Sequence, residues 1–494
     1  HPTQFYPGSA LAIITDLATA MEENDLVSIR KLLHQLGLTP FFQSEPPTPY
    51  DEAVRQTWYL ENVFYHAVPD LYARVAQAMD DAAAESICSS LIGIGFWPGG
   101  DRDGNPFVDA QTTWHVSERL RATLLRCYRR EIRDLRRRIT FKHVATVLDQ
   151  LQDQIEFAML HPEDERLSVA DLTSRLEEVA ALVLEQSNGL YIDRVRAFLF
   201  KLRLFGLHFA SMDVRQDSRV IRSAMDSVLT ASGEDVLSFR SLPVQEQVDR
   251  LFAWTGREDL AKLDVERHQD VLDSLRVMRK IQKQNGERAC HRFIISNCRG
   301  ILDVATIFAL SRATGADEDV ALDIVPLFET IADLERSSEE MEAMYAHPVY
   351  RRHLQHRKDR QTVMLGFSDG TKDGGYLRAN WAIYQAKQTL TQASKAADVT
   401  VVFFDGRGGP PARGGGNTHR FYASLGHDIQ NDEIQTTIQG QTISSNFGIP
   451  KSAGFNLELL LTAGLQNRLF EDQSSEMSVG QSALLSELGE LSYR

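Results

Sequence analysis

The 494-residue sequence has few cysteines, no long apolar run and no excess of positive charge. Its four cysteines, Cys88, Cys127, Cys290 and Cys298, show no CxxC spacing, which argues against both a zinc site and a disulfide scaffold. No apolar run approaches the roughly 18–20 residues that cross a bilayer, and nothing at the start resembles a signal peptide. We therefore expect a protein of the reducing cytoplasm with no membrane partner.

The net charge of −15 argues against a nucleic-acid partner, because an acidic chain repels phosphates overall. Several catalytic motifs are also missing from the sequence. It contains no G-x-x-x-x-G-K-[ST] phosphate loop, no H-E-x-x-H and no G-x-G-x-x-G. Dinucleotide-binding, phosphate-loop ATPase and zinc protease functions therefore lose support.

Long amphipathic patterns dominate the first part of the sequence. Helical periodicity predicts helices over 10–36, 52–92 and 115–139. The last of these carries nine arginines. They form either a surface for a nucleic acid or another partner, or a solvated helix face, and the acidic charge of the whole chain favours the second.

Short apolar runs rich in Val, Ile and Phe replace this pattern from residue 293 onward. The runs are "FIISNC", "DIVPLFET", "VMLGFSDG", "VVFFDGRGG" and "EIQTTIQG", and helical patterns such as 374–395 separate most of them. Two earlier stretches share the signature, "GIGFWPGGDRDGNP" and "HFASMDVRQD". Strands that alternate with helices predict βα units and a parallel sheet.

Polar or charged residues at the end of every predicted strand favour a (β/α)₈ barrel over a doubly wound sheet, whose chemistry gathers at one or two switch points. We expect an α/β protein, predominantly helical, with a TIM-like barrel that lacks its first strand because that strand would lie before His1. The prediction is a single catalytic domain over 1–494. Its helix-rich segments are 10–92 and 107–290, its regular βα repeats cover 293–440, and its C-terminal helices cover 450–494.

Glu329 and Asp369 end or follow two successive strands, so their carboxylates suit a hard cation such as Mg²⁺, which takes few protein ligands and many waters. Either residue could instead cap the helix that follows it. Lys372 comes three residues after Asp369. It would reach a substrate phosphate or enolate, or else pair with Asp369 or Asp373.

The stretch "VVFFDGRGGPPARGGGNTH" places Arg407 and Arg413 among six glycines, a pattern that favours binding of a phosphate or carboxylate over an incidental exposed loop. Arg215, flanked by Asp213 and Asp217, and Arg102, flanked by Asp101 and Asp103, suit either an anion or a local ion pair. Trp97 belongs either to the core or to the wall of a pocket for a small planar anion.

Six motifs in order resemble phosphoenolpyruvate carboxylase: "HPT", "WPGGDRDGNP", "MDVRQD", "PLFET", "GFSDGTKDGG" and "FDGRGGPPARGGG". The resemblance implies a (β/α)₈ barrel embedded in many helices and a homotetramer that is a dimer of dimers. It also implies that bicarbonate carboxylates phosphoenolpyruvate with Mg²⁺ or Mn²⁺, through carboxyphosphate and an enolate. The product is oxaloacetate, which feeds the tricarboxylic acid cycle.

The same resemblance implies a role for each matching residue. Glu329 and Asp369 would be the metal ligands, His1 the base that deprotonates carboxyphosphate, and Arg215 a phosphate contact. The remaining catalytic candidates are Lys372 near the carboxylated intermediates, Arg407 for CO₂ and enolate, and Arg413 on a mobile loop. The remaining substrate-binding candidates are Trp97, Arg102, Asp405, Gly408 and Gly409.

Three features depart from the family pattern. Asp405 stands where the family has histidine, and we expect it to orient Arg407 through a salt bridge. Pro98 also stands where the family has a different residue before "GGDRDGNP". We further expect a fragment that lacks the segment before His1 and the C-terminal part. Alternatives are another metal-dependent lyase that uses phosphoenolpyruvate or an enolate, and a non-catalytic homologue that serves as a structural subunit.

Overall fold

A computed structural model describes residues 8–40, 47–79, 91–255, 263, 265–316, 320–407, 417–426, 428–469 and 477–493. His1, Gly408, Gly409 and Arg413 lie outside the described residues. Within them, no helix combines the length and the apolar character needed to cross a membrane.

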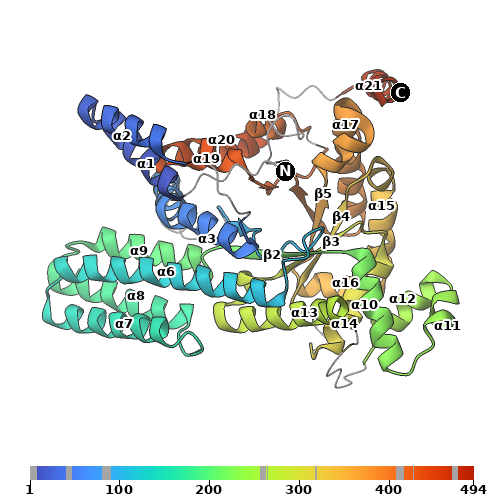
Figure 1. The fold of residues 1–494 in the computed structure, drawn as a ribbon, viewed down its shortest axis with the longest axis horizontal. Helices are drawn as coiled ribbons and strands as arrows, with labels where there is room; N and C mark the ends of the chain where they lie inside the picture. The colour runs from blue at the N-terminus through green and yellow to red at the C-terminus, as the bar shows by residue number, and fades with distance from the viewer. Residues whose placement is uncertain are drawn as a thin grey trace.

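Within the described part of the chain, seven parallel strands form one sheet in chain order, each paired with the next. Figure 1 shows β2 to β5 at the centre of this sheet. They are β1 (Gly95–Phe96), β2 (Ser211–Asp217), β3 (Arg292–Ser296), β4 (Asp323–Phe328), β5 (Arg360–Leu365), β6 (Thr400–Asp405) and β7 (Gln435–Thr436). The sequence predicted a strand in each of these places, and all seven are confirmed. Because every pair is parallel, the carboxyl ends of all seven strands lie at the same edge of the sheet.

The central strands are buried on both faces, which explains their continuous apolar runs. Side chains on the inner face form a small separate core against which Trp97 packs. This core consists of Ile294, Val325, Leu327, Met364 and Phe404. It closes the floor of the space that the curved sheet partly surrounds.

Helices make up most of the chain. Before β2 they are α1 (Gly8–Glu22), α2 (Leu26–Leu38), α3 (Pro49–Tyr59), the π-helical turn η1 (Leu60–Phe64), α4 (Tyr65–Ala76), α6 (Ala110–Arg138), α7 (Lys142–Leu160), α8 (Val169–Ser187) and α9 (Ile192–Phe205). Between β2 and β4 they are α10 (Ser218–Ala231), α11 (Val236–Ser241), α12 (Val244–Phe252), α13 (Glu266–Asn285), the 3₁₀ turn η2 (Glu287–Ala289) and α14 (Ile301–Ala313). After β4 they are α15 (Ile331–Ala346), α16 (Pro348–His356), α17 (Phe367–Ala396), α18 (Thr418–Ala423), α19 (Gln441–Phe447), α20 (Pro450–Leu469) and α21 (Val479–Tyr493).

Two predicted helices are divided in the structure. The helical segment predicted over 10–36 is divided between α1, which ends at Glu22, and α2, which Asp25 caps by accepting hydrogen bonds from the backbone of Val27 and Ser28. The prediction over 52–92 becomes α3, η1 and α4, and residues 80–90 lie outside the described part. The helix predicted over 115–139 is confirmed within α6.

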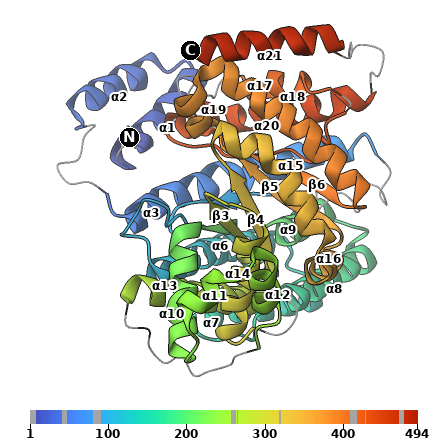
Figure 2. The same cartoon turned by 90° about the vertical axis from the view of Figure 1, so that its right-hand side faces the viewer.

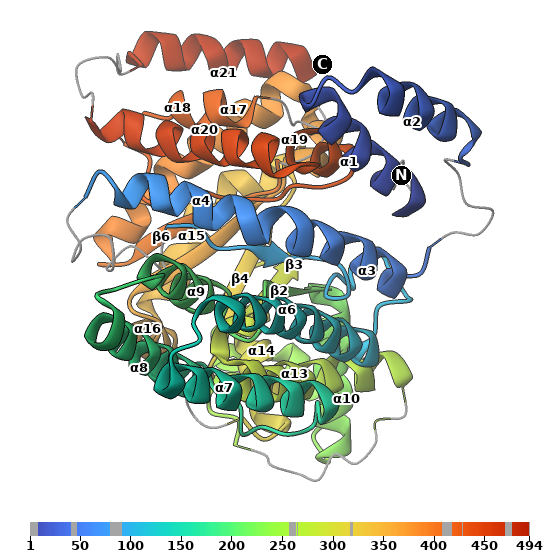
Figure 3. The same ribbon diagram turned by 90° about the vertical axis from the view of Figure 1, so that its left-hand side faces the viewer.

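Helices surround the sheet on several sides, and α1, α2 and α18 to α21 lie above it in Figures 2 and 3. Four strands each have a helix packed against them: α10 contacts β2, α15 contacts β4, α16 contacts β5, and α17 contacts β6. Helices α6 to α9 form a bundle at one side. Several α6 arginines pair with acidic residues of neighbouring helices, as Arg130 does with Glu61 and Arg133 with Glu156. The ion pairs account for part of the basic stretch within the fold itself.

Candidate active site

A cavity of about 940 Å³ opens at the carboxyl edge of the sheet. Five predicted site residues line it: Trp97, Arg215, Glu329, Asp369 and Lys372. Helix α3 on one side and helix α20 on the other complete its walls. The structure therefore brings these five side chains, predicted separately from the sequence, around one common cavity.

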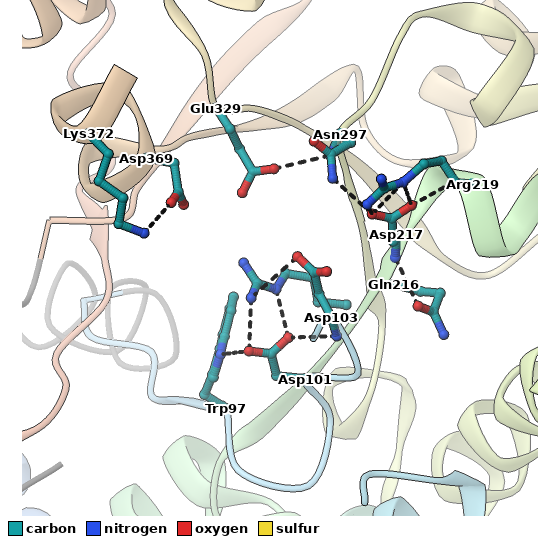
Figure 4. Close-up of polar contacts among 11 residues, drawn as sticks. Trp97, Asp101, Asp103, Gln216, Asp217, Arg219, Asn297, Glu329, Asp369 and Lys372 are labelled. Atoms are coloured by element: carbon teal, nitrogen blue, oxygen red, sulfur yellow. Dashed lines mark hydrogen bonds and ion pairs between the residues drawn. The ribbon is translucent and has the colours of Figure 1, made fainter. Parts of the chain in front are cut away.

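Glu329 directly follows β4 and lies between Asp369 and Asn297 (Figure 4). Its side chain is buried and accepts a hydrogen bond of 3.2 Å from the backbone N–H of Asn297. Gly366 lies so close that a Cβ there would be 3.1 Å from the Glu329 Cα and 3.2 Å from its Cγ. The missing side chain lets the start of α17 approach the end of β4.

The pKa of Glu329 is raised to about 7. Burial is the main cause, and the nearby carboxylates of Asp369 and Asp103 raise it further, against opposing effects of Arg215 and the Asn297 N–H. A carboxyl that is costly to ionise alone gains most from a nearby cation.

Asp369 lies in the first turn of α17 and accepts a 2.7 Å hydrogen bond from the Lys372 ammonium group. Both side chains are at least half exposed, so this pair is free to rearrange when a charged ligand enters. Asp373, the other predicted partner of Lys372, instead accepts a hydrogen bond from the backbone of Ile331.

Glu329 and Asp369 fit a divalent cation in chemistry and position. Both carboxylates line the same cavity, where oxygen ligands suit a hard cation, and Asp369 helps to raise the pKa of Glu329. Among the described residues no cluster of three or more His, Cys, Asp or Glu side chains could hold a metal. The remaining ligands of a cation held by these two carboxylates would be water and substrate, as Mg²⁺ prefers.

Arg215 points into the same cavity from β2, held by Asp101 through bonds of 2.7 Å and 3.0 Å. Its guanidinium carbon also lies 5.4 Å from the Trp97 ring centre, and the Trp97 indole N–H donates to Asp101. The flanking residues proposed as its partners are engaged elsewhere, Asp213 with Arg292 and Asp217 with Arg219. The alternative of an ion pair with a flanking aspartate is therefore wrong, because Arg215 pairs with Asp101 at the cavity wall.

A tight backbone contact produces this arrangement. The loop after β1 runs alongside β2, with the Arg215 N–H donating to the Gly100 carbonyl and the Arg102 N–H donating to the Arg215 carbonyl. A Cβ on Gly100 would lie 1.9 Å from the carbonyl oxygen of Asp213. Only glycine fits this close approach.

Comparison with known families then decides the kinship of the chain. The family description "Phosphoenolpyruvate carboxylase" matches residues 14–173 and 156–494. The chain belongs to the phosphoenolpyruvate carboxylase family.

Individual relatives agree. The chain is 32% identical to a phosphoenolpyruvate carboxylase of Xanthomonas euvesicatoria over 86% of its length and 51% of the relative's. It is 27% identical to one of Nitrosomonas eutropha and 28% identical to one of Shewanella sediminis, in each case over 95% of its own length and 57% or 58% of the relative's. The chain thus spans little more than half the length of these carboxylases.

Arg102 does not line the cavity, although the carboxylase motif that contains it does. Its buried guanidinium pairs with Asp270 at 3.3 Å and donates to Thr113 at 3.0 Å. The flanking Asp101 and Asp103 that we expected as partners lie toward Arg215 instead. Arg102 fastens the glycine-rich loop to α6 and α13.

The expected salt bridge from Asp405 to Arg407 is replaced by another pair. Asp405, at the end of β6, is fully buried and accepts hydrogen bonds of 2.8 Å from both Lys387 and Tyr422. Arg407 is also buried, with its guanidinium over the Phe421 ring, and does not line the cavity in this structure. In this carboxylase-family chain Asp405 therefore forms its salt bridge with Lys387.

The sequence interpretation missed two residues, Asn297 and Lys387. Asn297, just after β3, takes a left-handed backbone (φ 51°), donates its N–H to Glu329 and donates its side-chain amide to Asp217. It obeys the strand-end rule used for the other site residues, which could have revealed it. Lys387 lies within the apolar stripe of α17, where a charged residue is itself a signal of a buried partner.

Proposed function

We propose that the full-length protein carboxylates phosphoenolpyruvate with bicarbonate to give oxaloacetate and phosphate. Family membership supports this, and the observation that carries it is the cavity in which Glu329, Asp369, Arg215 and Lys372 meet. Glu329 and Asp369 would hold Mg²⁺ or Mn²⁺. When bound, the cation would neutralise charge on the substrate phosphate and enolate oxygens.

The proposed reaction balances in three steps. A bicarbonate oxygen attacks phosphorus, and the bond from phosphorus to the enol oxygen breaks to give carboxyphosphate and the enolate of pyruvate. Carboxyphosphate loses its carboxyl proton to a base and separates into CO₂ and phosphate. The enolate carbon then attacks CO₂ and forms the new carbon–carbon bond.

Residues of this chain would serve these steps as follows. Arg215, oriented by Asp101, would bind the phosphate, and Lys372 would leave Asp369 to contact the carboxylated intermediates. Arg407 would hold CO₂ and the enolate after moving from Phe421 toward the cavity. By resemblance, His1 would be the base, and Arg413 with Gly408 and Gly409 would complete the anion site.

Other parts of the proposal concern the whole protein. One further strand between β7 and β1 would close the sheet into a (β/α)₈ barrel. A homotetramer in the cytoplasm that replenishes the tricarboxylic acid cycle is the proposed context. Three buried free cysteines, Cys127, Cys290 and Cys298, suit a reducing compartment.

An assay of oxaloacetate formation tests the function directly. Full-length protein with phosphoenolpyruvate and Mg²⁺ should form oxaloacetate only when bicarbonate is supplied. Turnover of phosphoenolpyruvate without bicarbonate would instead indicate another lyase of this substrate. Complete inactivity, with metal and substrate saturating, would favour a structural subunit.

A further inference from the structure

A buried network of three polar side chains connects β6, α17 and α18 beside Arg407. The Oδ2 atom of Asp405 accepts from the Lys387 ammonium and from the Tyr422 hydroxyl, each at 2.8 Å. Asp405 and Lys387 have exposed side-chain fractions of 0% and 1%, and Tyr422 is also buried. Three charged or polar groups fully removed from water imply a specific role, because burial of this kind is costly without one.

The network contacts Arg407 through one aromatic ring. Phe421 precedes Tyr422 in α18, and its ring lies 4.2 Å from the Arg407 guanidinium carbon. The Lys387 ammonium lies 5.2 Å from the centre of the same ring. Fixing Tyr422 therefore fixes the surface on which Arg407 rests.

Charge balance gives a second connection. Lys387 and Arg407 are two cations near a single ring, and Arg407 disfavours the charged form of Lys387. Asp405 is the anion bonded to Lys387, and its other carboxylate oxygen, Oδ1, has no hydrogen-bond partner among the residues that the structure describes. Without the aspartate, the two cations would repel each other in a place where water cannot screen them.

The backbone at Asp405 is held equally firmly. Asp405 pairs with Leu365 of β5, and its backbone carbonyl accepts a hydrogen bond from the N–H of Thr437, the residue after β7. Arg407 follows two residues later, immediately after the last bond of the sheet, from the Gly406 N–H to Leu365. The backbone that carries Arg407 thus starts from a fixed point.

We propose that Lys387, Asp405 and Tyr422 are positioning residues that set the place and the electrostatic environment of Arg407. The kinetic part of this inference rests on the proposed function, because it assumes that Arg407 acts in carboxylation. The structural part does not. It states that the network determines how tightly Arg407 is held against Phe421.

The mildest test is Tyr422→Phe in the full-length protein, which removes the hydroxyl that donates to Asp405 and keeps the ring. The reactivity of Arg407 toward phenylglyoxal, followed by mass spectrometry of its peptide, should rise several-fold, because a loosened guanidinium is more accessible. Asp405→Asn should raise it further. The matched control is Tyr345→Phe in α15, which loses a comparable buried bond of 2.9 Å to Ser394, seven residues along α17 from Lys387. Arg407 reactivity in this control should equal that of the unchanged protein.

Kinetics supply the second readout. Tyr422→Phe should lower kcat/KM by roughly 3- to 10-fold, the scale of one typical lost hydrogen bond, while Tyr345→Phe leaves it unchanged. In an Arg407→Lys background the Tyr422 change should add nothing, since its effect acts through the guanidinium. A purely structural role predicts additive losses instead.

The outcomes separate the two proposals. Absence of bicarbonate-dependent activity in the unchanged protein would reject the proposed function, and the phenylglyoxal result would still decide the positioning. Unchanged Arg407 reactivity in both Tyr422→Phe and Asp405→Asn would overturn the positioning role. So would additive kinetic losses in an active enzyme.

Discussion

The Arg215 guanidinium forms a two-point ion pair with Asp101, a residue 114 positions earlier in the chain. The pair joins the loop after β1 to β2 and leaves Arg215 on the cavity wall. Its partner Asp101 also accepts from Trp97. A phosphate entering the cavity would meet a guanidinium whose direction is already fixed, so little ordering remains to be done on binding.

Replacing Glu329 by Gln should remove most activity while the fold persists. Gln keeps the shape and the bond from the Asn297 N–H, but it cannot offer a charged oxygen to a cation. We expect kcat/KM to fall by at least about 100-fold and Mn²⁺ affinity to fall in parallel. Steady-state kinetics and Mn²⁺ titration measure the two effects. The control is Glu339→Gln, at an exposed position of α15, which should change neither kcat/KM nor Mn²⁺ affinity.

The raised pKa of Glu329 predicts how stability depends on pH in metal-free protein. Its pKa is about 7 when folded, against an ordinary value of 4.5. Between these values the folded state binds more protons than the unfolded state, so stability falls as the pH rises through this window. Relative to Glu329→Gln, the unchanged protein should lose ~1–3 kcal/mol between pH 4.5 and 8. Urea unfolding in EDTA measures it; parallel curves for the two proteins would contradict the prediction.

Gly100→Ala should destabilise the protein because its Cβ would collide with the carbonyl oxygen of Asp213. We expect a loss of roughly 3 kcal/mol, together with a higher KM for phosphoenolpyruvate, since the Asp101 loop must move. Urea unfolding midpoints check the first effect. Gly37→Ala in α2, where no atom lies within 4 Å, is the matched control and should change stability by less than ~1 kcal/mol.

Arg102 and Arg215 should respond differently to the same substitution. Arg102→Met breaks the ion pair of the buried Arg102 side chain with partly buried Asp270 and should cost about 3 kcal/mol of stability, with KM for phosphoenolpyruvate changed less than about twofold. Arg215→Met should instead raise that KM at least about tenfold, because a charged contact at the cavity wall is lost. A large KM effect from Arg102→Met would place that residue in substrate binding after all.

The sequence predicted the strands well because parallel strands buried on both faces are continuous apolar runs. The positions of Glu329 and Asp369 followed, since parallel strands end at one edge of the sheet. Asp101 as the partner of Arg215 was beyond reach, because it depends on how a loop lies against a strand 114 residues away. The helix break at Asp25 was missed for a different reason. One capping side chain is a weak signal within a long amphipathic pattern.

The pairing of Lys387 with Asp405 shows a further limit. A lysine in a long helix is normally solvated, and an aspartate two residues before an arginine suggests a local pair. Only the packing of α17 against β6 and α18 reveals that the lysine is buried and takes the carboxylate.

The walls of the cavity run from Glu52 in α3 to Leu457 in α20. A small molecule bound there would cross-link early and late parts of the chain, so its binding energy would oppose separation of either end. Amide hydrogens near both ends should then exchange more slowly together on ligand addition, as one cooperative unit.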